Sequence, residues 1–135
     1  MIKVLTISNI SLGFFLLSSF SPFQPSNDSI IRGKEVYTIF CQNCHMEDGK
    51  GTPGLNPPLA KADYLKKPSK TLIDIILNGQ SGEVVVNGKK YNALMPAQDY
   101  LTDMQIADVL NYICNSWGNK ISGNLTPETV KALRK

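Results

Sequence analysis

Cys41-Gln42-Asn43-Cys44-His45 constrains the structure of this chain more than any other segment. Two cysteines three positions apart, with a histidine directly after them, form the pattern by which a c-type haem is attached. On one helical turn, each thiol can add to a vinyl group at the same porphyrin edge, and the histidine then falls under the iron. The pentapeptide therefore predicts one covalently bound haem c, with Cys41 and Cys44 as attachment sites and His45 as the proximal iron ligand.

Three other uses of these residues are open on the sequence alone. A thioredoxin-like redox pair needs a strand–helix–strand context, whereas the segment before Cys41 has a helical pattern. A disulfide between Cys41 and Cys44 explains neither His45 nor the long loop that follows. A Cys3His zinc site would need the distant Cys114 to converge on Cys44 and His45, which are adjacent in the chain. The haem prediction explains more of the sequence than any of these.

The second axial ligand is predicted by elimination. The chain has a single histidine, so two imidazoles cannot bind one iron, and its four methionines become the candidates. Met1 lies in a predicted targeting segment, Met46 is tethered to the proximal side, and Met104 falls in the first turn of a predicted helix, where a core or surface role is expected. Met95 precedes a proline in a loop and is therefore held extended. Met95 is the predicted distal ligand, and a packed loop methionine is the alternative.

Apolar periodicity and capping residues predict three main helices, over residues 30–40, 70–78 and 103–117. The expected N-caps are Asp28 or Ser29, then Ser69, then Thr102 in a capping box with Gln105. One apolar stripe of the last helix is expected to hold Ile106, Leu110, Ile113 and Trp117, with Gly118 ending the helix. A short terminal helix is expected to run to about Arg134, with Thr126 as its cap and Pro127 at its first helical position.

Two non-helical features complete the pattern. Residues 46–68 hold four clusters of glycine or proline, and a loop of that length needs a functional reason in a small domain. Asn87-Gly88, between Val84-Val85-Val86 and Lys89-Lys90-Tyr91, predicts a hairpin with a type I′ turn. Three helices and one hairpin make a thin core, so a cofactor is expected to fill the middle.

The first residues have the pattern of a targeting segment. Lys3 is the only charge before Asp28, and an apolar run over residues 12–20 is followed by small residues. This predicts a secretory signal peptide over residues 1–25, with an uncleaved anchor as the alternative. The folded part is then exported, to the bacterial periplasm or the outer face of the cytoplasmic membrane. It would touch the membrane only if the segment stays attached.

Composition excludes several classes of function. The 135 residues fit one small domain, and 42% hydrophobic against 19% charged residues exclude a disordered chain. The net charge of +3 is too small and too scattered to indicate a nucleic-acid partner.

Beyond these patterns, residues 30–117 resemble class I monohaem c-type cytochromes. The resemblance rests on a helix with Gly33 and Tyr37 running into the haem motif, a Met95-Pro96 loop, and a last helix ending in the aromatic Trp117. Residues 56–60 and 87–92 also look like small periplasmic cytochromes associated with dehydrogenases or nitrite reductases. The resemblance implies an all-α cytochrome c-like fold of about three main helices around one covalent haem, with a small hairpin before the distal loop. It places the cytochrome domain over residues 27–118 and a tail with a short helix over 119–135.

The same resemblance implies several contacts. Gly33 is expected to make room for the last helix, with Tyr37 packing near Tyr112 or Trp117. The carbonyl of Pro57 is expected to accept a hydrogen bond from the proximal histidine, which fixes its tautomer. The family commonly has glycine directly after that histidine, where this chain has Met46.

An iron held by histidine and methionine has no open coordination site, so one-electron transfer is the predicted function and no catalysis is expected. The chain could serve as the cytochrome subunit of an oxidoreductase, with a dehydrogenase as donor and a reductase or oxidase as acceptor. The alternative is a peroxidase or gas-binding protein whose Met95 dissociates. The absence of a sensor's output domain and of a distal acid–base histidine favours the carrier.

Further expectations concern side chains around the haem. The expected apolar wall consists of Phe40, Leu55, Leu59, Leu72, Ile76, Leu94 and Leu110. The lysines expected near the haem, which either steer an acidic partner or are ordinary surface, are Lys50, Lys61, Lys66, Lys67, Lys70, Lys89 and Lys90. Cys114 is expected to be a small buried hydrophobe, with an intermolecular disulfide or partner contact as the alternative.

Overall fold

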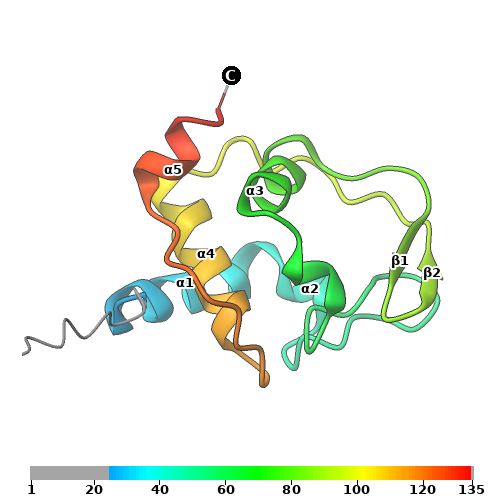
Figure 1. The fold of residues 1–135 in the computed structure, drawn as a ribbon. Coiled ribbons are helices and arrows are strands. Elements are labelled where there is room, and N and C mark those ends of the chain that lie inside the picture. Colours follow the sequence, from blue (N-terminus) through cyan, green and yellow to red (C-terminus); the bar gives the residue numbers. More distant parts are fainter. Residues whose placement is uncertain (1–24, 135) are drawn as a thin grey trace, which may run out of the picture.

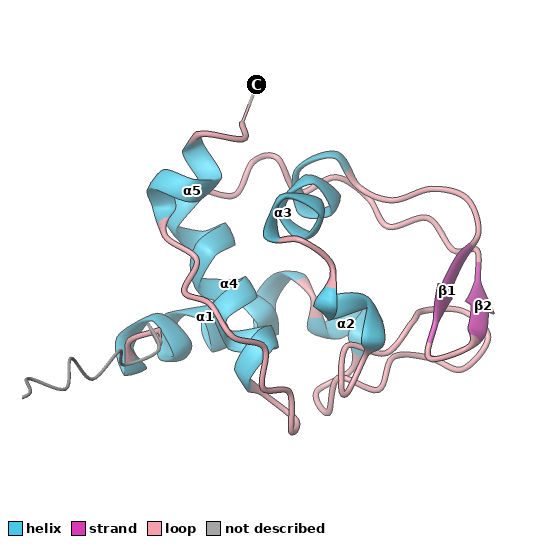
Figure 2. Ribbon diagram, in the orientation of Figure 1, coloured by secondary structure: helices cyan, strands magenta, loops and turns pink. Residues whose placement is uncertain are grey.

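The computed structural model describes residues 25–134, and over that range the chain is mostly helical with one small hairpin (Figures 1 and 2). The elements are α1 (Asn27–Phe40), α2 (Gln42–His45), the 3₁₀ helix η1 (Asp63–Lys66), α3 (Ser69–Asn78), β1 (Val84–Val86), β2 (Lys89–Tyr91), α4 (Asp103–Asn115) and α5 (Pro127–Lys131). The three longest described helices are α1, α3 and α4, which confirms the predicted fold class. The predicted signal peptide falls on residues that the structure does not describe, except for its last position.

The α1–α4 crossing is the centre of the fold, and it depends on Gly33 (Figure 1). A methyl group at Gly33 would lie 2.0 Å from the carbonyl oxygen of Asp108 and 2.7 Å from Cβ of Tyr112. Only a residue without a side chain lets the two backbones approach this closely. The implied role of Gly33 is confirmed.

Aromatic rings close the crossing on the side of α2. The ring centroid of Tyr37 lies 5.5 Å from that of Tyr112 and 5.0 Å from that of Trp117, and the last two rings are 5.4 Å apart. The tilted and edge-on angles are those that aromatic pairs prefer. The sequence left open whether Tyr37 packs near Tyr112 or near Trp117, and in the structure it packs against both.

A buried polar network joins α1 to α4, and no pattern in the sequence predicted it. Asp108 is only 5% exposed, and its carboxylate accepts hydrogen bonds from Arg32 Nε at 2.6 Å and from Ser29 Oγ at 2.6 Å. Asn111 Nδ2 donates to Ser29 Oγ at 3.0 Å and to the carbonyl oxygen of Leu125 at 2.9 Å. A buried carboxylate is tolerated only with such partners, so the network fixes both helices and the C-terminal tail in one arrangement.

The apolar core lies between α1, α3 and α4. Ile73 of α3 and Ile106 and Val109 of α4 are completely buried within it. The tail returns along α4, where Val130 of α5 is also completely buried. Among residues 25–134, no helix combines the length and the apolar character needed to cross a membrane.

The hairpin forms as its turn residues predict. Val84 pairs with Tyr91 in antiparallel register, and Asn87 and Gly88 both have positive φ, of 50° and 74°. Positive φ at both central positions defines the type I′ turn. Asn87 also exchanges two hydrogen bonds with Asp63, each from a backbone N–H to a side-chain oxygen, at 2.8 and 2.9 Å. The hairpin is thereby held against η1.

Two of the three N-caps predicted for the main helices are wrong, whereas Thr126 caps α5 as predicted. Helix α1 is capped by Ser26, whose hydroxyl accepts from the backbone N–H of Ser29, so neither Asp28 nor Ser29 is the cap. The hydroxyl of Ser29 instead belongs to the buried network. Helix α3 already includes Ser69, and Pro68, which has no side-chain hydrogen bond to give, occupies the cap position.

The third N-cap is confirmed, but α4 and α5 both end earlier in the chain than predicted. Thr102 and Gln105 form a complete capping box at the start of α4. Helix α4 ends at Asn115, so Trp117, with a left-handed φ of 52°, lies beyond the helix and not on its apolar stripe, and the expected stop at Gly118 is two residues too late. The terminal helix ends at Lys131 instead of continuing to Arg134.

Candidate functional site

The three residues of the attachment pattern lie on a single turn. Cys41 ends α1 and begins α2, and its carbonyl oxygen accepts hydrogen bonds from the backbone N–H of Cys44 at 3.2 Å and of His45 at 3.0 Å. Both cysteines are free thiols, Cys44 exposed and Cys41 half-buried, where burial raises the pKa of Cys41 to about 11. The structure thus has no Cys41–Cys44 disulfide, and the flanking helices α1 and α2 give no strand–helix–strand context for a thioredoxin-like pair.

His45 is buried and held in one orientation. Its Nδ1 lies 3.0 Å from the carbonyl oxygen of Pro57, and because a carbonyl only accepts hydrogen bonds, Nδ1 must carry the proton. Burial lowers the pKa of His45, with the Pro57 bond acting in the opposite direction, so the ring stays neutral. The implied role of Pro57 is confirmed, and the lone pair is left on Nε2, the atom that a metal would bind.

The free ring nitrogen is suitably placed for a haem iron. Within residues 25–134, Nε2 of His45 makes no hydrogen bond, and no fully buried side-chain nitrogen or oxygen there lacks a partner. Nε2 is therefore not enclosed in the core but reaches accessible space beside the turn that holds the two thiols. A neutral imidazole with a free, oriented nitrogen and two adjacent thiols is the donor set that covalent haem requires.

Two aromatic side chains hold the turn after the histidine. The hydroxyl of Tyr37 donates to the carbonyl oxygen of Met46 at 2.7 Å, and the indole N–H of Trp117 donates to that of Glu47 at 3.0 Å. Burial raises the pKa of Tyr37, so its hydroxyl remains a neutral donor. Met46 has a φ of 63°, a conformation that glycine adopts without cost. These bonds stabilise the turn that glycine commonly makes in the resembling family. The polar atoms of the aromatic side chains Tyr37 and Trp117 were the only sequence signal for them.

Gly51 positions the carbonyl of Pro57. It has a φ of 66°, and a methyl group there would lie 2.5 Å from the Pro57 oxygen. We expect Gly51→Ala to displace that oxygen, to destabilise the holoprotein by about 2 kcal/mol and to raise its reduction potential, because a weaker bond from His45 makes the ligand less basic. Denaturant unfolding and a potentiometric titration measure both effects.

Gly54→Ala is the matched control for this prediction. Gly54 also has a positive φ, of 76°, but an added methyl group would meet nothing within 4 Å. The Gly54→Ala variant should therefore show the effect of backbone strain alone, and its reduction potential should be unchanged. Equal potentials for the two variants would contradict the role given to Gly51.

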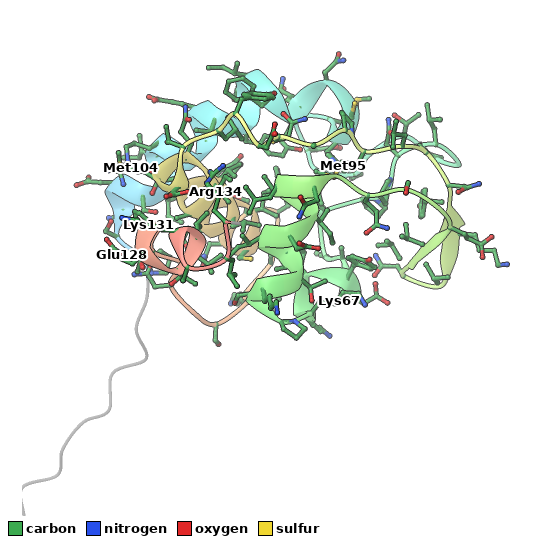
Figure 3. The ribbon with its side chains drawn as sticks, turned by 90° about the horizontal axis from the view of Figure 1, so that it is seen from above. Lys67, Met95, Met104, Glu128, Lys131 and Arg134 are labelled. Atoms are coloured by element: carbon green, nitrogen blue, oxygen red, sulfur yellow. The ribbon has the colours of Figure 1, made fainter. Side chains whose placement is uncertain are left out.

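Met95 has a fixed backbone on the segment that runs past α3 (Figure 3). Its N–H and carbonyl form an antiparallel pair with Gln80, with both hydrogen bonds at 2.9 Å. Gly79 permits this approach, because a methyl group there would lie 2.5 Å from the Met95 oxygen. The side chain is half-buried, whereas Met46 and Met104 are 38% and 50% exposed. The role of Met95 as ligand stays a prediction.

Five of the seven residues expected to form the apolar wall around the haem belong to the protein core or pack against it. Leu72, Ile76 and Leu110 are buried, and Phe40 and Leu59 are partly buried against them. Leu55 and Leu94, at 55% and 73% exposed, do not join the protein core, and their place in the haem wall stays a prediction. Both lie in loops, which the sequence pattern could not orient.

The zinc alternative is excluded by the position of Cys114. Among residues 25–134, no three or more histidine, cysteine, aspartate or glutamate side chains gather in a way that could hold a metal ion. Cys114 is buried in α4, and this burial raises its pKa to about 11. It is an inert small side chain of the core, as expected.

Comparison with known proteins agrees with this site. Residues 30–117 match the cytochrome c family. Cytochrome c-552 of Thermus thermophilus is 41% identical over 110 residues, covering 76% of this chain and 83% of the relative. The cytochrome c subunit of the quinone alcohol dehydrogenase of Gluconacetobacter polyoxogenes is 35% identical over 111 residues, and that of the gluconate 2-dehydrogenase of Pantoea cypripedii is 38% identical over 106. The matches cover 80% and 76% of this chain but only 23% and 24% of those two subunits.

A helical fold with two thiols and one oriented imidazole on a single turn defines a protein with covalently attached haem. The chain belongs to the cytochrome c family. It is an electron carrier with haem c as its cofactor.

Proposed function

We propose that Cys41 and Cys44 attach the haem, that His45 and Met95 are its axial ligands, and that the chain passes single electrons between redox proteins. When bound, the haem supplies an iron that alternates between the ferric and ferrous states. The observation that supports the proposal is the bond between His45 Nδ1 and the Pro57 carbonyl, which fixes the ring and leaves the lone pair on Nε2. Methionine as the second ligand raises the reduction potential relative to a second histidine.

The closed coordination distinguishes a carrier from a catalytic haem protein. With both axial positions filled, oxygen or peroxide has no site to bind. Peroxidase or gas-binding chemistry would require Met95 to leave and a distal acid–base group to replace it. The only histidine of the chain is His45, which this proposal places on the proximal side.

Redox proteins are the proposed partners, with a dehydrogenase as donor and a reductase or oxidase as acceptor. Relatives named as cytochrome subunits of dehydrogenases support the donor class. All seven lysines predicted near the haem are exposed. Lys50 pairs with Asp48 at 2.7 Å and Lys90 with Glu83 at 3.0 Å. Within residues 25–134 the other five form no ion pair, so they are free to steer an acidic partner, giving an association rate that falls with salt.

Export is proposed with this function. Covalent haem attachment occurs outside the bacterial cytoplasm, which supports a signal peptide or anchor over residues 1–25. The proposed division of the rest is a cytochrome domain over 27–118, supported by the family match over residues 30–117, and a tail over 119–135. The compartment is then the periplasm or the outer face of the cytoplasmic membrane.

An optical spectrum of the chain, expressed with its export signal and haem-attachment machinery, tests the proposal. We expect an alkaline pyridine spectrum of c-type haem, and in the ferric protein the weak far-red band of methionine–iron coordination. Covalent haem without that band would contradict Met95 as ligand and favour the open, catalytic site. Absence of covalent haem would contradict the whole assignment of Cys41, Cys44 and His45.

A further inference from the structure

Arg134, beyond the end of α5, binds a segment that lies far from it in the sequence. Its Nη1 donates to the carbonyl oxygen of Asp99 at 2.7 Å, and its Nη2 donates to that of Leu101 at 2.6 Å. Its Nε forms an ion pair with Asp103 at 2.7 Å, in the first turn of α4. The planar guanidinium group thus binds two backbone carbonyls and one carboxylate at once, with its donors in a fixed geometry.

The two carbonyls belong to the segment that leads from Met95 to α4. This segment has no regular secondary structure between the Gln80–Met95 pair and Thr102. Between those points, the N–H of Gln98 donates to the carbonyl of Ile76 at 2.8 Å, which attaches the segment to α3. The opposite attachment, toward α5, is made by Arg134 (Figure 3).

The tail that presents Arg134 is itself firmly anchored. Val130 is completely buried against α4. The side chain of Asn119 donates to the carbonyl of Ile113 at 2.8 Å, and Asn111 accepts from the N–H of Leu125 at 2.9 Å. Because both ends of the tail are attached to α4, Arg134 restrains the segment instead of following its motion.

We propose that Arg134 is a positioning residue for the distal ligand: it holds the segment after Met95 so that the methionine sulfur stays on the iron. The proposal rests on the proposed role of Met95. Dissociation of a ligand on a loop requires the loop to move, and each restraint on the segment makes that movement less frequent. Arg134 therefore acts with the Gln80–Met95 pair and the Gln98–Ile76 bond to limit how often the distal position opens.

Binding of imidazole to the ferric protein measures that opening. An external ligand that binds only the open form has an apparent dissociation constant equal to its intrinsic value divided by the open fraction. Arg134→Gln removes the charge-assisted hydrogen bonds and leaves a neutral, shorter polar side chain. We expect the apparent dissociation constant for imidazole to fall about tenfold and the far-red band to weaken, with Arg134→Lys intermediate.

Arg32→Gln is the matched control. Arg32 is likewise paired with an aspartate, to which it donates two hydrogen bonds at 2.6 and 3.0 Å, but that aspartate lies at the α1–α4 crossing. Loss of the Arg32 guanidinium group leaves the buried Asp108 carboxylate with fewer hydrogen-bond donors. The melting temperature should therefore fall at least as much as in Arg134→Gln. A purely structural effect of Arg134 would make imidazole binding follow the melting temperature in both variants.

The outcomes separate this inference from the proposed function. Tighter imidazole binding in Arg134→Gln with unchanged binding in Arg32→Gln supports the positioning role. Equal imidazole binding by Arg134→Gln and the unmodified protein, with the far-red band present in both, overturns that role and leaves Met95 as ligand. Absence of the band in the unmodified protein overturns Met95 as ligand and the role of Arg134 with it.

Discussion

Replacing Met95 with alanine is expected to abolish the far-red band of the ferric protein and to lower its reduction potential by on the order of 0.1 V. The thioether favours ferrous iron, and alanine offers no atom that could replace it. Water or an external ligand then gains access to the iron, so imidazole should bind without waiting for the loop to open. Absorption spectroscopy and a potentiometric titration of the purified holoprotein measure these changes.

Met104→Ala is the control for this experiment. Met104 is 50% exposed on the first turn of α4, so its replacement should leave both the band and the potential unchanged. A low-spin ferric spectrum and an unaltered potential in Met95→Ala would show that another side chain coordinates the iron. Loss of the band in Met104→Ala instead would assign the ligand to α4.

Gly33→Ala is expected to cost about 3 kcal/mol or more of the free energy of unfolding. The added methyl group would lie 2.0 and 2.6 Å from the carbonyl oxygen and carbon of Asp108. Both are backbone atoms of α4, and unlike the atoms of a flexible side chain they cannot move away by changing rotamer. The two helices must separate, which weakens the aromatic cluster and the buried network together.

Denaturant unfolding of the holoprotein, followed by circular dichroism, tests this expectation. Lys34→Ala, at the next and exposed position of α1, should change the stability by less than about 0.5 kcal/mol. A Gly33→Ala variant as stable as Lys34→Ala would mean that the helices do not cross at the distance described.

Local chemistry explains which parts of the fold could be predicted from the sequence. The Asn87-Gly88 turn and the Thr102–Gln105 capping box both formed as predicted, because each depends on a few adjacent residues. The N-cap of α1 was wrong because Ser29, a good capping residue, is engaged by Asp108, which is 79 residues away. Neighbouring residues give no sign of such a contact.

In the candidate site, too, local features could be predicted from the sequence and long-range contacts could not. The pentapeptide predicted the two thiols and the histidine, since their spacing along one turn is a local property. The bond from His45 to Pro57 came only through the family resemblance, because loop residues 46–68 have no periodicity that places a carbonyl. The bonds of Tyr37 and Trp117 to the turn after the histidine were missed, since they depend on how α1 and α4 cross.

The buried network at the crossing also bears on the order in which the molecule is completed. Ser29 reaches its partners Asp108 and Asn111 across 79 and 82 residues of chain. If the chain leaves the cytoplasm N-terminus first, the pentapeptide emerges well before the residues that hold α1 in place. Closing so long a loop is slow, since non-local contacts form late. We therefore expect the two thiols to stay accessible to the attachment machinery until the last third of the chain has followed, so that covalent modification would precede final packing.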